Sequence, residues 1–97
     1  MATFIRLASL TEQGIKNVQN FRAMVAEARE IMESHGVKLV QAWATLGEYD
    51  VVAIIDAPDA KSAAQVSALV AARGNFRAKT LSAVPISELT DAVEQGS

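Results

Sequence analysis

The chain has no cysteine and only one histidine, His35, among its 97 residues. The lack of cysteine excludes disulfides, thiolate metal sites and cysteine nucleophiles, and it is compatible with a reducing cytoplasm. With one imidazole and no thiolate, neither a zinc site nor a nucleophile with its base and orienting group can be assembled. We therefore expect no catalytic residues and no metal site.

Basic clusters and long apolar runs are also lacking. The formal charge is −2 at pH 7 and the nine lysines and arginines are scattered singly, which argues against a nucleic-acid surface. No apolar run approaches the roughly 18 residues of a membrane span. Strand-like residues begin at Thr3, which leaves no room for a signal peptide. We expect a cytoplasmic protein without nucleic-acid or membrane partners.

Small apolar side chains dominate what is present. Hydrophobic residues make up 51% of the chain but aromatic residues only 5%, so we expect a thin and closely packed core. The length is that of one small domain. We assign residues 1–97 to a single domain, with its core at about 3–85.

Hydrophobic periodicity and turn residues divide the chain into strands and helices. Strands are predicted at Thr3–Leu10, about Val37–Leu46, about Tyr49–Asp56 and Phe76–Val84. Two helices are predicted, one from a cap at Thr11 to His35-Gly36 and one from a cap at Asp59 to Gly74, followed by a short helix at Ser87–Gln95.

The first long helix has apolar residues at steps of three and four, which predicts one buried face. They are Ile15, Val18, Phe21, Val25, Ala28 and Met32. The second helix is predicted to bury Ala63, Val66, Leu69 and Val70. Because Gly14 and Asn20 are poor helix formers, the first turns are expected to form a kink or a separate segment.

The order βαββαβ predicts an α+β, ferredoxin-like antiparallel sheet of strand order 4-1-3-2 with two helices on one face. Strand Val51–Ile55 is apolar on both sides and needs cover on both. We expect a second copy to supply that cover, sheet against sheet, in a homo-oligomer. The alternative is that the C-terminal helix folds back over the sheet.

Four short motifs resemble those of the GYD domain family. They are Thr11-Glu12-Gln13-Gly14-Ile15-Lys16, Gly47-Glu48-Tyr49-Asp50, Asp56-Ala57-Pro58-Asp59 and Gly74-Asn75-Phe76-Arg77. The resemblance covers about residues 3–85 and implies a relation to the dimeric α+β barrel superfamily, in which ferredoxin-like sheets pair. That superfamily includes cofactor-free monooxygenases, haem-handling enzymes and effector-sensing domains, so the resemblance does not choose a chemistry.

Three residues form a candidate site for a small-molecule ligand: Arg6, Trp43 and Tyr49. Arg6 lies mid-strand, where an unpaired charge is costly, so it either anchors an anion or pairs with Glu48 or Asp50. The two aromatic residues flank the Gly47 turn and either line a pocket for a planar ligand or pack with their polar atoms at an edge.

Glu48 and Asp50 lie two residues apart beside the turn and point to one face. They form either a paired-carboxylate acid/base site or a solvated hairpin end.

These observations predict a small non-catalytic, homo-oligomeric accessory or sensor module that binds a small ligand or a protein partner. The alternative is a cofactor-independent monooxygenase-like or haem-associated enzyme of the dimeric α+β barrel type. In that case His35, at a helix end, is a candidate axial ligand or general base; otherwise it is a partly exposed helix-end residue. No motif identifies a cofactor.

Overall fold

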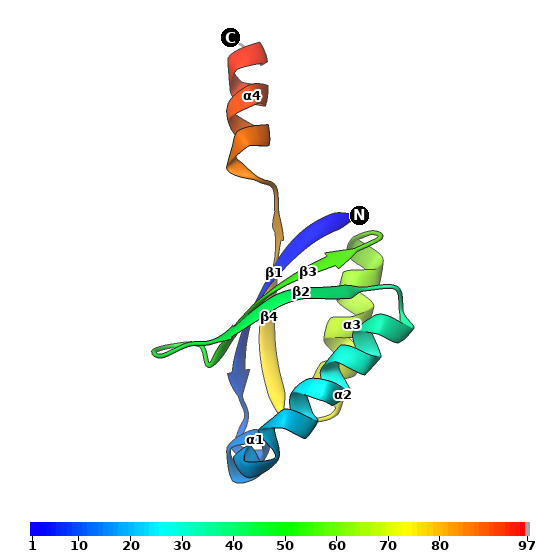
Figure 1. The fold of residues 1–97 in the computed structure, drawn as a ribbon, viewed down its shortest axis with the longest axis vertical. Coiled ribbons are helices and arrows are strands. Elements are labelled where there is room, and N and C mark those ends of the chain that lie inside the picture. Colours follow the sequence, from blue (N-terminus) through cyan, green and yellow to red (C-terminus); the bar gives the residue numbers. More distant parts are fainter. Residues whose placement is uncertain (97) are drawn as a thin grey trace.

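A four-stranded antiparallel sheet of order β2-β3-β1-β4, with helices against one face, forms the body of the protein (Figure 1). The computed structural model describes residues 1–96. The elements in chain order are β1 (Ala2–Leu10), α1 (Glu12–Lys16), the 3-10 helix η1 (Val18–Asn20), α2 (Phe21–Ser34), β2 (Lys38–Ala44), β3 (Val51–Ala57), α3 (Ala60–Ala72), β4 (Phe76–Ala83) and α4 (Ile86–Gly96). The predicted ferredoxin-like fold is confirmed.

Alternation along the central strand β1 assigns side chains to the two faces of the sheet. Phe4, Arg6 and Ala8 are buried on the side of α2 and α3, and Ile5 and Leu7 lie on the opposite side. In the register of the sheet, Arg6 is paired with residue 53 of β3 and residue 80 of β4. The charged residue is therefore enclosed on both sides by neighbouring strands.

The hydrophobic core lies between the sheet and the two long helices, α2 and α3. It consists of two clusters, one with Phe4, Met32, Val37, Ile55, Ala57, Ala63 and Val66 and one with Ala8, Met24, Val70 and Phe76. Alanines contribute at several of these positions, so the layers approach closely, as the composition predicts.

The first predicted helix is divided, as Gly14 and Asn20 indicated, into α1, η1 and α2. The predicted burial of Ile15 and Val18 is wrong, because they are 60% and 48% exposed. The break at η1 interrupts the helical period, so the apolar stripe of α2 does not continue into α1, which lies at one end of the sheet (Figure 1). Leu69 is also exposed, on the outer side of α3.

The C-terminal helix α4 projects away from the sheet (Figure 1). Its apolar residues Ile86, Leu89 and Val93 are 73%, 51% and 63% exposed. The alternative that this helix folds back over the sheet is therefore wrong. Within residues 1–96, no helix has the length and apolar character to cross a membrane.

Among residues 1–96, no element covers one face of the sheet. We call the face opposite α2 and α3 the open face. Its apolar residues larger than alanine are Ile5, Leu7, Trp43, Val52, Ile54 and Leu81. Trp43 and Leu81 are nearly half exposed, and the other four are partly buried.

Candidate functional site

Arg6 is the only charged or polar side chain among residues 1–96 that is classed with the buried core, at 5% exposure. Its Nη1 donates a hydrogen bond of 2.7 Å to Ser67 Oγ on α3. Ser67 Oγ lies 3.0 Å from Thr80 Oγ1 on β4. A chain of polar groups therefore runs from Arg6 on β1 to Ser67 on α3 and back to Thr80 on β4.

No carboxylate of residues 1–96 pairs with the Arg6 guanidinium. The two ion pairs in this part of the chain lie on the surface, Lys16 with Glu12 and Arg73 with Glu27. The predicted alternative of an ion pair with Glu48 or Asp50 is thus not formed within the chain. Burial lowers the pKa of Arg6, because desolvation penalises the charged form and no neighbouring anion compensates for it.

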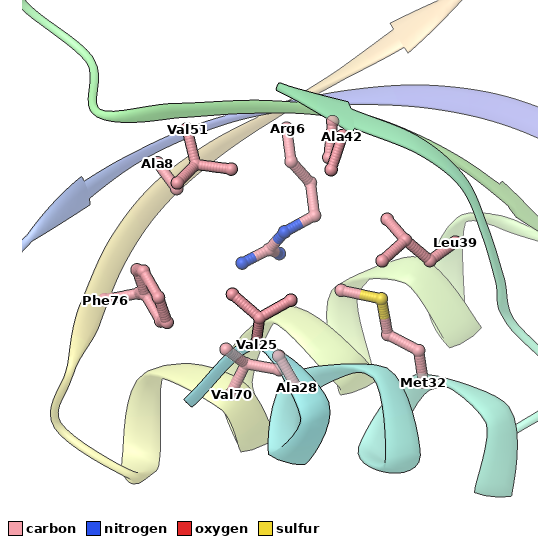
Figure 2. A pocket seen from close by; sticks show the side chains of 11 residues that line it. Arg6, Ala8, Val25, Ala28, Met32, Leu39, Ala42, Val51, Val70 and Phe76 are labelled. Atoms are coloured by element: carbon pink, nitrogen blue, oxygen red, sulfur yellow. The ribbon is translucent and has the colours of Figure 1, made fainter. Parts of the chain in front are cut away.

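The guanidinium points into a cavity between the sheet and the helices (Figure 2). The cavity has a volume of about 60 Å3, and we call it the Arg6 cavity. Its lining residues, apart from Arg6, are all apolar: Ala8, Val25, Ala28, Met32, Leu39, Ala42, Val51, Ala53, Val70 and Phe76. A single cation in an apolar enclosure is suited to a ligand with one negative group and an apolar body.

A groove of about 370 Å3 runs along the edge strand β2 beside this cavity. The groove and the Arg6 cavity share Val25, Ala42 and Val51 as lining residues. Trp43 and Arg29 also border the groove. We call it the β2 groove.

Tyr49 lies apart from the other two predicted site residues. It borders a separate hollow together with Leu7 and Ser9, which are on the opposite face of the sheet from Arg6. Trp43 borders the β2 groove, but the register of the sheet puts its side chain on the open face, opposite Arg6. The three predicted site residues therefore do not line one common hollow.

The residues that lead into β3 hold the β2–β3 connection against β1. Gly47 has a φ of 102°, the left-handed conformation expected of a turn glycine. Asp50 Oδ2 accepts a 2.8 Å hydrogen bond from the Leu10 N–H, and the Asp50 N–H donates to Ala8 O at 2.9 Å. The Asp50 carboxylate thus has a structural partner, unlike either alternative predicted for it.

A second junction joins the start of α1 to the α3–β4 connection. The Thr11 N–H donates to Asn75 O at 3.0 Å, and Gln13 Nε2 donates to Arg73 O at 3.0 Å and Asn75 Oδ1 at 3.2 Å. Gly14 is buried at this junction, and a Cβ at this position would lie 2.2 Å from Asn75 O. Two motifs about sixty residues apart therefore form one structural unit.

His35 lies at the end of α2, where its Nδ1 is 2.8 Å from Ile31 O and 3.1 Å from Ser34 Oγ. A contact of Nδ1 with a carbonyl oxygen is typical of the tautomer with the proton on Nδ1. Among residues 1–96, no three or more His, Asp or Glu side chains gather as metal ligands. The imidazole is thus held by its own helix end.

Ser67, the partner of Arg6, was not among the residues predicted for the site. Ala63, Val66 and Val70 are buried on the inner side of α3, and Ser67 occupies the position four residues after Ala63, on the same side. A polar residue in this apolar stripe was the available signal. The prediction instead assigned Leu69 to the inner side.

The chain is similar to a known family of domains and to a protein of nearly the same length. The GYD domain matches residues 4–93. The chain is 36% identical over 90 residues to the glutamine synthetase and cystathionine beta-lyase binding protein of Thermus thermophilus, covering 92% of this chain and 95% of that relative. No solved structure matches the chain.

Proposed function

Because this chain belongs to the GYD domain family, we propose that it is a non-catalytic, homo-oligomeric accessory module that binds partner enzymes. The observation that carries the proposal is its similarity to a relative whose name describes binding to two enzymes. That similarity spans 92% of this chain and 95% of the relative. The relative is therefore nearly all one such domain, and its binding role has to reside in that domain.

The open face supports the homo-oligomeric part of the proposal. It combines partly buried aliphatic residues with the more exposed Trp43 and Leu81. The edge strands add Gln41, Arg77 and Lys79 to the same face, and an apolar centre with a polar rim is typical of an interaction surface. We assign a second copy to it, since α4 does not cover it and the family resembles a superfamily in which such sheets pair face to face. A two-fold arrangement buries the same residues of both copies.

Sedimentation velocity at micromolar concentration tests the self-association. We expect the parent protein to sediment as a dimer or larger species, and Leu81→Glu to sediment near the monomer mass of 10.3 kDa, because it places a charge in the paired apolar face. Leu69→Glu is the matched control, since Leu69 is an exposed leucine on the outer side of α3. A monomeric parent protein, or an unchanged Leu81→Glu oligomer, contradicts the sheet-to-sheet arrangement.

Biolayer interferometry with the purified chain immobilised tests the binding of enzymes. The analytes are purified glutamine synthetase and cystathionine beta-lyase from the organism that encodes this chain, with serum albumin as the negative control. We expect saturable binding of at least one of the two enzymes. If neither enzyme binds above the albumin signal, the proposed partner class is wrong, whatever the oligomeric state.

A further inference from the structure

The Arg6 guanidinium is a buried cation whose hydrogen-bonding capacity is mostly unused by the chain. A guanidinium carries five N–H donors in a planar fork. Within residues 1–96, its one hydrogen bond is the bond to Ser67, and its charge has no ionic partner. A hydroxyl accepts a hydrogen bond but does not neutralise the charge, so the cation has no counter-charge within residues 1–96. No fully buried side-chain nitrogen of residues 1–96 lacks a hydrogen-bond partner, so the guanidinium nitrogens that are not bonded to Ser67 reach the accessible space of the cavity.

We propose that the Arg6 cavity binds a short-chain aliphatic carboxylate, with its two carboxylate oxygens on the Arg6 guanidinium and its alkyl chain among the apolar walls. A carboxylate matches the guanidinium fork and forms paired charge-assisted hydrogen bonds with it. Binding supplies the missing counter-charge without removing the hydrogen bond between Arg6 and Ser67.

The size and lining of the cavity define the ligand further. One water needs about 10–15 Å3 by the same measure, so a cavity of about 60 Å3 takes a few non-hydrogen atoms. This favours an acid of roughly three to five carbons over larger ligands. The apolar lining offers no further polar partners to the remaining oxygens of a phosphate or sulfate, so these inorganic anions pay a desolvation cost that an alkyl chain avoids.

The β2 groove provides the approach to this cavity. Its shared residues include the small Ala42 on the edge strand, and Arg29 borders the groove on α2. A cation on the approach raises the local concentration of anions. Phe21 and Val25 of α2, which also line the groove, contribute an apolar surface along which the alkyl chain of the ligand passes.

Isothermal titration calorimetry with butyrate at constant ionic strength tests the proposal, with butyramide and inorganic phosphate as comparison ligands. Arg6→Met removes the charge and keeps an apolar side chain of similar length. We expect saturable butyrate binding to the parent protein and at least about tenfold weaker binding to Arg6→Met, because the paired charged hydrogen bonds are lost. Arg22→Met, at an exposed position of α2, is the matched control and should retain the parent affinity.

A second variant tests the cavity without changing Arg6, and the melting temperature of Arg6→Met shows whether that variant is folded. Ala28→Leu leaves Arg6 in place but fills part of the cavity from α2, so it should also weaken butyrate binding. Arg6→Met itself should melt no lower than the parent protein, because replacing an uncompensated buried charge by an apolar group is neutral or stabilising.

Four results would overturn the proposal. They are no butyrate binding to the parent protein, equal affinity of the parent and Arg6→Met, equal binding of butyrate and butyramide, and phosphate binding as tight as butyrate binding. The first three would show that binding does not depend on a carboxylate paired with Arg6, and the fourth would show that the site does not require an alkyl chain.

Discussion

Gly14→Ala should destabilise the protein by a steric effect at the junction between α1 and the α3–β4 connection. A Cβ at Gly14 would lie 2.2 Å from Asn75 O, whereas real Cβ contacts are essentially never under 3.0 Å. The atom that it meets is a backbone oxygen, which cannot turn aside as a flexible side chain would. Either α1 or the α3–β4 connection must therefore move.

The magnitude follows from the hydrogen bonds at this junction. Three hydrogen bonds join Thr11 and Gln13 to Arg73 and Asn75, and each contributes about 0.5–1.5 kcal/mol net. Their loss costs about 3 kcal/mol, which is offset by up to about 1 kcal/mol from the better helix propensity of alanine. A net loss of about 2 kcal/mol lowers the melting temperature of a domain this small by about 8–16 °C.

Differential scanning calorimetry of the parent protein, Gly14→Ala and a control measures this effect. Gly96→Ala is the matched control, because a Cβ at Gly96 meets nothing within 4 Å and should leave the melting temperature within a degree or two, or about 0.3 kcal/mol. Equal melting temperatures for Gly14→Ala and Gly96→Ala would refute the claim that the two motifs approach too closely for a side chain.

Three further predictions concern the β2–β3 connection and the start of α3. Gly47→Val should destabilise by about 1 kcal/mol or more through its φ of 102° alone, since the space around it is open; an unchanged melting temperature would contradict this. Asp50→Ala should cost about 1–3 kcal/mol in urea unfolding by leaving the Leu10 N–H without its acceptor, and Asp50→Asn should recover part of it; equal urea midpoints for all three proteins would rule the bond out as a source of stability. Hydrogen bonds from Ser62 lower the pKa of Asp59 below its usual 3.8, so the carboxylate stabilises the fold above that pH and less as the pH falls through the lower folded value. Asp59→Asn keeps a hydrogen-bond acceptor at the cap but does not titrate, so its melting temperature should fall less than that of the parent protein between about pH 5 and pH 2. Equal falls in both proteins would mean that the protonation of Asp59 does not contribute to the pH dependence of stability.

The local features of the fold were predictable because short stretches of chain determine them. Thr11 and Asp59 cap α1 and α3 as expected, since a side-chain acceptor satisfies the free N–H groups of a first helical turn. Gly36, Gly47 and Gly74 all adopt positive φ, which only glycine does without strain. The order of the strands followed from the order of the elements and the handedness of the crossovers.

Contacts between distant segments depended on the packing of whole elements. Alternation along β1 placed Arg6 on the helix side, but its partner depends on where α3 crosses the sheet, and that crossing brings Ser67 to it. The same geometry places the Trp43 side chain on the open face and Tyr49 at a separate hollow on that face, away from the Arg6 cavity.

The exposed regions also depended on tertiary structure. Helical periodicity identifies an apolar stripe but not whether a surface lies opposite it, so the stripe predicted through Ile15 is exposed in α1. For the same reason, the apolar residues of α4 did not determine its direction, and the helix extends away from the sheet (Figure 1). Sequence patterns specify what each segment needs to bury, and the packing of the other segments determines whether the chain itself provides the cover.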